Sequence, residues 1–378
     1  MKQVEWKLYQ GNAETVLKDF QDEFFDCCIT SPPYYALRDY GTGKWVGGDE
    51  KCDHVANHNA TKRQGNEQFN ENRPSREETI CKGYYRSVCP KCGAVMVDEQ
   101  IGLEETPEQY IDRLVRVFRE VRRVLKNDGT LWVNIGDSYA GSGKGSGGDG
   151  VPTGKQATNK GSNFLGREKP PVKYNCKQKD LIGIPWMLAF ALRNDGWYLR
   201  QDIIWAKPNP MPESVTDRCT KSHEYIFLLS KSQKYYFDYD AIKVNSNPIY
   251  ADRYKYDFHT GEKENGADRP NNKTNTAGKK EYTGKANKKS VWNVPISGGY
   301  KDESGAHHAT FPIALIEPCV LAGSRDGGYV LDIFNGSGTT GVCALQNGRN
   351  YVGIDLSNKY IDISTNRLRG ITDQLRLF

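Results

Sequence analysis

The 378-residue sequence lacks any long hydrophobic run. Its longest apolar stretch, Ile184 to Leu192, falls well short of the roughly 20 residues that a membrane-spanning helix needs. The first ten residues contain no apolar segment of the secretory kind. Hydrophobic residues make up only 37% of the chain, and the mean hydropathy is -0.72. We therefore expect a cytoplasmic protein with one good core and long solvated loops, and no membrane partner.

A disulfide framework is also not expected. The chain has ten cysteines but no secretory signal, which favours a reducing cytosol in which cysteines serve as core residues or metal ligands. Cys27 and Cys28 belong to an apolar run, so we interpret them as packing residues rather than nucleophiles.

Charge of one sign is only slightly in excess, with a formal net charge of +5 and a pI of about 8.5. A balance of this size is compatible with nucleic acid but does not establish it. The distribution is more informative, because lysine, asparagine and glycine crowd residues 141–175 and 243–290. Four tyrosines interleave with the second stretch: Tyr250, Tyr254, Tyr256 and Tyr282.

Strand and helix patterns alternate along the chain. Strands are expected at 24–30, 130–136, 198–206, 224–230, 329–333 and 351–355. Helices are expected at 107–126, 178–194, 312–321, from Thr340 onward and at the C-terminus. This alternation predicts an α/β fold with a largely parallel sheet.

A glycine loop follows the predicted strand at 329–333. Gly336, Gly338 and Gly341 satisfy the spacing G-x-G-x-x-G, which lets a backbone approach a ligand closely and offers it N–H groups at a helix start. Asp355 ends the next strand, where a carboxylate can hold ribose hydroxyls. By itself the loop suits either a nicotinamide dinucleotide or S-adenosylmethionine.

The position of the glycine loop narrows this choice. Few elements follow it, so the remaining strands of a doubly wound sheet must come from the N-terminal part of the chain. The sheet is then circularly permuted, which dehydrogenases rarely are.

A proline-rich loop, Ser31-Pro32-Pro33-Tyr34, directly follows the first predicted strand. An ordinary turn would explain the prolines. A functional interpretation is more specific. The exocyclic amine of a base is a poor nucleophile because its lone pair is delocalised into the ring, and hydrogen bonds from its N–H groups to acceptors would localise that lone pair on nitrogen. The Ser31 hydroxyl and the Pro32 carbonyl could accept hydrogen bonds from the two N–H groups. The prolines would stiffen the loop, and Tyr34 could stack on an extruded base.

These two motifs carry a resemblance. TSPPY near the N-terminus and DIFNGSGTTG near the C-terminus resemble the DNA amino-methyltransferases in their permuted, beta-class motif order. Further similar segments are DGTLWVNIGDSY (128–139), WYLRQDIIWAKPNPMPES (197–214), HEYIFLLSK (223–231), HHATFP (307–312) and VGIDLSNKY (352–360).

The resemblance implies a circularly permuted Rossmann-like fold that uses S-adenosylmethionine and carries inserted zinc-binding and DNA-recognition regions. Its catalytic residues would be Ser31, Pro32, Pro33 and Tyr34. Its cofactor-binding residues would be Thr30, Phe311, Pro312, Asp332, Phe334, Asn335, Gly336, Ser337, Gly338, Thr339, Thr340 and Asp355. Asp332 would hold the glycine loop in shape.

The target base is left open. Serine at position 31 and the H-x-A-x-F-P form at 307–312 favour cytosine N4 over adenine N6. More remote alternatives are a nicotinamide-dependent dehydrogenase, a methyltransferase acting on RNA or on a protein amide, and a nucleic-acid-binding module without activity. The family also suggests bacterial or phage origin, with a homodimer and a companion restriction endonuclease as candidate partners.

Cysteine and histidine bracket a polar insertion at 45–103. Cys89-x-x-Cys92 is typical of a zinc knuckle, and Cys52 with His54 completes a Cys3His set, with Cys81 and His58 as spare candidates. Buried thiols in a turn are the simpler explanation, but a polar loop offers little burial. We predict structural zinc, because methyl transfer needs no Lewis acid.

The predicted organisation has four parts. Residues 1–44 and 104–240 form the catalytic half, 45–103 the zinc-binding insertion, 241–300 the target-recognition region and 301–378 the cofactor-binding half. The basic stretch 243–290 is expected to grip DNA, and Arg38, Lys207 and Lys221 are expected to contact phosphates.

Overall fold

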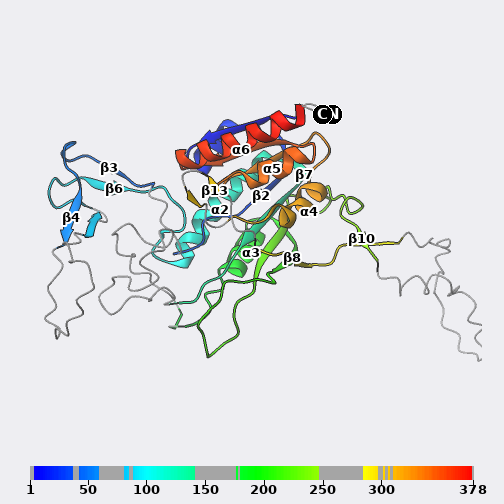
Figure 1. The fold of residues 1–378 in the computed structure, drawn as a ribbon, viewed down its shortest axis with the longest axis horizontal. Coiled ribbons are helices and arrows are strands. Elements are labelled where there is room, and N and C mark those ends of the chain that lie inside the picture. The colour runs from blue at the N-terminus through cyan, green and yellow to red at the C-terminus, as the bar shows by residue number, and fades with distance from the viewer. Residues whose placement is uncertain are drawn as a thin grey trace, which may run out of the picture.

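A central mixed sheet organises the chain in a computed structural model that describes residues 4–36, 42–58, 81–84, 88–140, 176–177, 179–246, 284–296, 301–302, 305–306 and 310–376 (Figure 1). In sheet order its strands are β1 (Trp6–Gln10), β16 (Asn350–Asp355), β15 (Tyr329–Asp332), β2 (Phe25–Thr30), β7 (Leu125–Ile135), β9 (His223–Ser230), β8 (Tyr198–Ala206) and β12 (Val291–Asn293). The run from β1 to β7 is parallel, while β9 lies antiparallel to both β7 and β8.

Strands from the two ends of the chain are neighbours in this sheet. Val330 and Leu331 of β15 pair with Cys27 and Cys28 of β2. The side chains of β2 are buried along its whole length, as expected for a strand covered on both faces.

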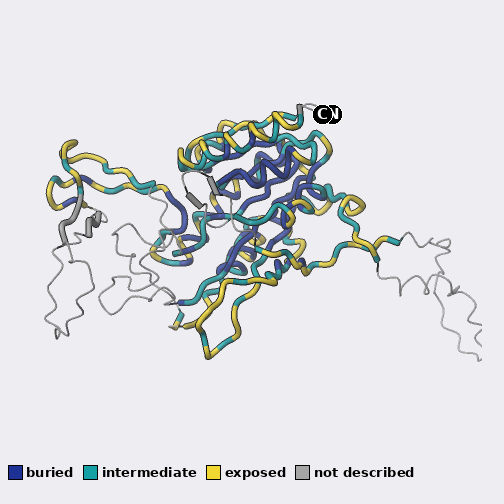
Figure 2. The backbone as a smooth tube through the Cα atoms, viewed as in Figure 1, coloured by how far each residue is buried: buried dark blue, intermediate teal, exposed yellow. Residues whose placement is uncertain are grey.

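Helices cover both faces of the sheet. One face carries α1 (Ala13–Val16), the 3-10 turn η1 (Leu17–Asp19), α2 (Pro107–Val124) and α3 (Ile184–Asn194), and the other carries α4 (Ile313–Gly323), α5 (Thr339–Gln346) and α6 (Asn358–Arg376). Side chains along β7 point alternately to the two faces of the sheet, so each face has its own part of the core. Leu131 and Val133 pack toward α2, while Trp132 packs toward α4. The buried backbone of Figure 2 follows this sheet and the inner faces of its helices.

Small two-stranded ribbons lie outside the sheet. The pairs are β3 (Lys44–Val46) with β6 (Val95–Val97), β4 (Val55–His58) with β5 (Cys81–Tyr84), β10 (Val244–Asn245) with β11 (Lys285–Ala286), and β13 (Lys301–Asp302) with β14 (Gly305–Ala306). Figure 1 shows β3, β6 and β4 projecting together from the body of the protein.

The expected α/β class with a largely parallel sheet is confirmed. The helix predicted at 107–126 begins at Pro107 on the Thr106 cap, whose side chain accepts the Gln109 N–H. It ends two residues early, because Leu125 pairs with Phe25 and opens β7.

The helix predicted at 178–194 is wrong in its first turns. It starts only at Ile184, after Gly183 in a left-handed conformation at φ 86°. The Asp137 carboxylate accepts the N–H groups of Gly183 and Ile184, which are the groups that a helix start leaves unpaired. Leu181, within the range predicted as helix, is 51% exposed.

Two strands of the central sheet, β1 and β12, were not predicted from the sequence, and neither were the strands of the small ribbons. Within the described ranges, no helix is both long and apolar enough to cross a membrane.

The third glycine of the loop motif is required for packing rather than for backbone freedom. A Cβ on Gly341 would lie 2.6 Å from Cε1 of Tyr351 and 2.9 Å from Cδ2 of Leu368, both buried. Gly370 in α6 has open space around it.

These two helical glycines make a matched pair. We expect Gly341→Ala to lower the free energy of unfolding by about 1–3 kcal/mol through overpacking. Gly370→Ala should raise it by about 0.5–1 kcal/mol, because it only removes the backbone entropy of glycine. Urea unfolding of both variants measures the difference, and equal effects would contradict the packing role of Gly341.

Candidate active site

The topology brings polar residues from distant segments to one edge of the sheet. In parallel strands the carboxyl ends share an edge, so the residues after β1, β2, β15 and β16 meet there. Because β9 runs antiparallel, its beginning lies at this edge too, beside the end of β8, as the pairing of Ala206 with His223 shows.

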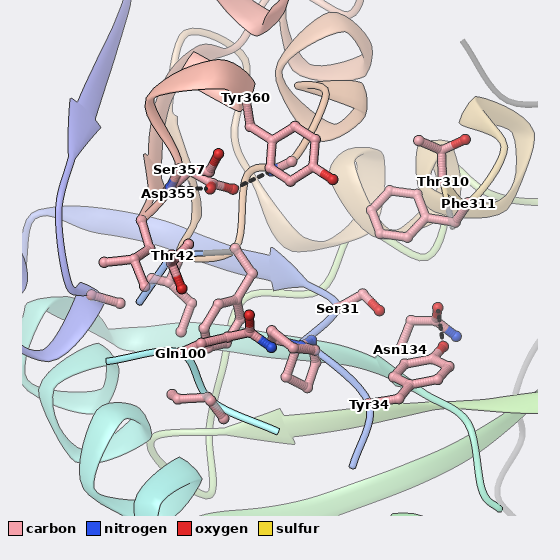
Figure 3. Close-up of a pocket in the computed structure, with 18 of the residues that line it drawn as sticks. Ser31, Tyr34, Thr42, Gln100, Asn134, Thr310, Phe311, Asp355, Ser357 and Tyr360 are labelled. Carbon is pink, nitrogen blue, oxygen red and sulfur yellow. Dashed lines mark hydrogen bonds between the residues drawn. The ribbon is translucent and has the colours of Figure 1, made fainter. Parts of the chain in front are cut away.

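A cavity of about 250 Å³ opens at this edge. Ser31, Pro32, Pro33 and Tyr34 line it together with Phe334, Gly336 and Asp355 of the opposite end of the chain. Residues of the proline-rich loop and the glycine loop therefore share one cavity. In Figure 3, Ser31 lies between the Tyr34–Asn134 pair and the end of the cavity formed by Asp355, Ser357 and Tyr360.

One buried carboxylate joins the two loops. The Asp332 Oδ1 atom accepts the Thr30 hydroxyl at 2.7 Å and the Phe334 N–H at 3.1 Å, while its Oδ2 accepts the Thr340 hydroxyl at 2.7 Å. Burial raises the pKa of Asp332 to about 6, and the three donors oppose that rise. Thr30 precedes Ser31, and Thr340 lies in the first turn of α5, so this carboxylate ties the end of β2 to the glycine loop.

Other residues of the glycine loop face inward. Asn335 accepts the Tyr351 hydroxyl at 2.7 Å and donates to Ser364 at 3.0 Å. Arg367 donates to the hydroxyls of Ser337 and Thr339 at 3.2 and 3.0 Å. These contacts fix the shape of the loop, of which Phe334 and Gly336 line the cavity.

Asp355 stands where a carboxylate can meet sugar hydroxyls. Its Oδ2 accepts the Gly336 N–H at 2.7 Å, and its Oδ1 accepts the Ser357 N–H at 2.9 Å. Burial raises the pKa of Asp355 to about 6, against the effect of both N–H donors. The carboxylate is therefore ionised at neutral pH, and each oxygen keeps lone-pair capacity for a ligand.

A second polar cluster lies at the other end of the cavity. The Tyr34 hydroxyl donates to Glu224 Oε2 at 2.6 Å, and Lys207 donates to Glu224 Oε1. Asn134 donates to Glu224 Oε2 at 3.3 Å. Burial and the neighbouring Glu224 charge raise the pKa of Tyr34, so its phenol stays protonated.

The predicted site residues fall into two groups. Eight line the cavity: Ser31, Pro32, Pro33, Tyr34, Phe311, Phe334, Gly336 and Asp355. The others lie behind it: Thr30, Pro312, Asp332, Asn335, Ser337, Gly338, Thr339 and Thr340. Most of the second group are buried and hold the loops rather than presenting atoms to a ligand.

Sequence reasoning missed several cavity residues. Asn12 follows the unpredicted strand β1. Thr42 lies just before the 45–103 insertion, and Gln100 lies near its end. Glu224 and Asn134 sit within segments that were recognised, but only the antiparallel direction of β9 reveals that Glu224 faces the cavity. The available signal was a polar residue at the very start of an apolar strand.

The expected phosphate contacts are not supported by the arrangement of Lys207 and Lys221. The Lys207 ammonium bonds Glu224 and lies 4.3 Å from the Trp205 ring centre. The Lys221 ammonium donates to the Asp137 carbonyl at 2.8 Å, and burial lowers its pKa. Arg38, Tyr250, Tyr254, Tyr256, Tyr282, His307 and His308 lie outside the described residues.

The four predicted metal ligands converge. The ligand atoms of Cys52, His54, Cys89 and Cys92 all lie within 4.8 Å of one another. Cys52 and Cys89 are 3.8 Å apart at sulfur, and Cys92 Sγ lies 3.6 Å from His54 Nδ1. Trp45 of β3 stacks on the His54 ring at 4.6 Å. Such a set could hold one tetrahedral ion.

This geometry agrees with similarities to known proteins. Residues 25–366 match the DNA methylase family. The chain is 39% identical over 363 residues to the type II methyltransferase M.Cfr9I of Citrobacter freundii, covering 96% of this chain and 87% of that one. It is 38% identical over 362 residues to the type II methyltransferase M.SmaI of Serratia marcescens, covering 96% and 90%.

The chain therefore belongs to the DNA methylase family, a family of amino-methyltransferases, and the predicted enzyme class is confirmed. Among solved structures, the fold is similar to that of the PvuII DNA methyltransferase (cytosine-N4-specific), with a TM-score of 0.52 and 14% identity over 98% of this chain and 92% of that one. At that identity the likeness concerns the fold alone.

Proposed function

We propose that this enzyme transfers a methyl group from S-adenosylmethionine to an exocyclic amino group in DNA, with cytosine N4 as the target ahead of adenine N6. The observation that carries the proposal is the shared cavity, in which the Ser31 loop faces the glycine loop. A dehydrogenase would leave the proline-rich loop without a task, and family membership argues against it.

The cavity residues suit this cofactor. Phe311, Phe334 and Tyr360 provide aromatic surface for an adenine ring, and Asp355 provides a carboxylate for ribose hydroxyls. The bound cofactor would supply an electrophilic methyl group on a sulfonium. Asp332 would act indirectly by holding the loop that carries Phe334 and Gly336.

The catalytic loop would aim the amine. The Ser31 hydroxyl and the Pro32 carbonyl would accept hydrogen bonds from the two amino N–H groups. These bonds would localise the lone pair on nitrogen and direct it at the methyl group. The Tyr110 hydroxyl donates to the Pro33 carbonyl at 2.8 Å, which stiffens the loop beside Pro32. Preorganised acceptors of this kind need no rearrangement as charge develops. Tyr34 would stack on the extruded base.

The choice of cytosine rests on Ser31 and on the resemblance of residues 307–312, of which 307–309 lie outside the described residues. Adenine N6 is the alternative target of the same geometry. RNA or a protein amide presents the same planar nitrogen, but the type II relatives favour DNA.

We also propose the domain roles given by the sequence. The direct pairing of β15 with β2 supports a circularly permuted order, with 301–378 as the cofactor-binding half. Residues 45–103 would be the zinc-binding insertion and 241–300 the target-recognition region. The type II relatives support a companion restriction endonuclease and a cytoplasmic location in a bacterium or phage, and a homodimer is the proposed assembly.

The metal of the insertion is proposed to be zinc. Ligands at about 2.3 Å around a tetrahedral ion lie roughly 3.8 Å apart, which is the observed Cys52–Cys89 sulfur spacing of 3.8 Å. Three thiols and one imidazole are the donor set that zinc prefers in closed structural sites.

Replacing the proposed amine-binding hydroxyl should separate chemistry from cofactor binding. We expect Ser31→Ala to lower kcat by about 10²–10³-fold, since one preorganised hydrogen bond to the reacting group is lost, with cofactor affinity unchanged. The assay incubates DNA with labelled cofactor, digests it to nucleosides and identifies the product by mass.

The matched control is Ser232→Ala, which follows β9 at the opposite edge of the sheet and should keep full activity. N4-methylcytosine is the expected product, and N6-methyladenine would select the alternative base. Full activity of Ser31→Ala would remove the serine from the mechanism.

Cofactor affinity should depend on the ionisation of Asp355. Its pKa is raised to about 6, so protonation begins as the pH falls through that value and removes the charged acceptor for ribose hydroxyls. We expect S-adenosylmethionine to bind about tenfold more weakly at pH 5 than at pH 7.5. Calorimetric titration measures this, and Asp355→Asn should bind weakly at both pH values. A wild-type affinity that rises or stays constant toward pH 5 would contradict the assignment.

The metal site predicts a stoichiometry. Purified protein should contain one zinc ion per chain by elemental analysis, and Cys92→Ser should lose most of it because one thiolate ligand is removed. Cys219→Ser, at an exposed cysteine outside the cluster, is the matched control and should keep the full amount. Zinc near zero in the wild-type protein would refute the proposal.

A further inference from the structure

We propose that Glu224 is a positioning residue that sets the orientation of the Tyr34 ring against the extruded base. The inference rests on the proposed function, because the ring matters to catalysis only if a base stacks on it.

Glu224 is itself held in place from several sides. One carboxylate oxygen is bound by Lys207, and both groups are largely buried, with side-chain exposures of 15% and 16%. Asn134 donates to the other oxygen at 3.3 Å and also to the Tyr225 carbonyl at 3.1 Å. A carboxylate with these partners cannot change rotamer without leaving a buried ammonium unpaired. Glu224 is therefore a rigid acceptor.

The Tyr34 hydroxyl is pinned to that acceptor. It donates to Glu224 Oε2 at 2.6 Å, the distance of a charge-assisted hydrogen bond. Because the oxygen lies at the tip of the ring, this bond fixes where the far end of the phenol points. Glu224 comes from β9, whereas Tyr34 comes from the loop after β2, so the catalytic loop is anchored to a different strand.

Gly136 confines the ring from behind. A Cβ on Gly136 would lie 2.7 Å from Tyr34 Cε2 and 3.3 Å from both Cδ2 and Cζ. The φ of Gly136 is not in the positive range, so the glycine is needed for this close approach and not for its backbone conformation. With its tip bonded and one edge against Gly136, the ring has a single orientation toward the cavity.

Such a fixed ring determines the plane of a stacked base. The base plane in turn decides whether the amino hydrogens reach the Ser31 hydroxyl and the Pro32 carbonyl. Displacements of about 1 Å in a reacting group cost on the order of 100-fold in rate, so a tilted platform would lower turnover without abolishing binding.

The test is a double-mutant cycle of Glu224→Ala and Tyr34→Phe, assayed as methyl transfer to unmodified plasmid DNA. Each single variant should lower kcat about tenfold, which is the loss of one hydrogen bond to a charged group. The double variant should fall by clearly less than the 100-fold that independent effects would give, because the Tyr34–Glu224 bond is already lost in each single variant. The DNA KM should change much less than kcat.

Rescue separates positioning from general stabilisation. Glu224→Gln loses the ion pair with Lys207 but keeps a hydrogen bond to the Tyr34 oxygen in either amide orientation. Because that hydrogen bond is the one that orients the ring, this variant should recover most of the activity. Glu317→Gln, at an exposed carboxylate of α4, is the matched control and should match the wild type. Tyr34→Phe removes one atom only, so its result stands even if Glu224→Ala unfolds.

Several outcomes would overturn the inference. These are full activity of Tyr34→Phe, additive losses in the double variant, or a Glu224→Gln defect as large as that of Glu224→Ala. Failure of the proposed function looks different, because the wild-type protein itself would then label no base in DNA.

Discussion

The active-site geometry depends on one buried carboxylate. Asp332 is 2% exposed and accepts two hydroxyls and a backbone N–H, from Thr30, Thr340 and Phe334. Thr30 lies 302 positions away in the sequence, so this side chain joins the loops of the two ends of the chain, beside the backbone pairing of β15 with β2. A buried charge is tolerated only with such partners, which makes the two loops adopt one relative position.

The rest of the site is built outward from that junction. Hydrogen bonds of Asn335 and Arg367 hold the glycine loop in shape. Gly336 of that loop and Asp355 after β16 line the cavity. On the other side, the base of the 45–103 insertion packs on the proline-rich loop, where the Ala36 N–H donates to the Gly102 carbonyl at 2.9 Å. Gln100 then completes the cavity wall. The proposed zinc would thus stabilise a segment that touches the catalytic loop.

Sequence alone located most of the fold and both loops, because strand patterns, the glycine spacing and the proline pair are local signals. It also found the four converging metal-ligand candidates. It missed Glu224, since neither the direction of β9 nor its neighbours can be derived from its own residues. It extended α3 by several residues, because the Asp137 cap comes from a distant segment. Such cross-chain contacts depend on the tertiary structure and leave no local pattern.

The most direct test of the account is the structure of a complex with S-adenosylmethionine and a DNA duplex whose target base is extruded. We expect the sulfonium methyl to lie in the cavity between Gly336 and Ser31, with the amino nitrogen about 3–3.5 Å from it. A cofactor bound elsewhere, or a base whose amino group points away from Ser31, would contradict it.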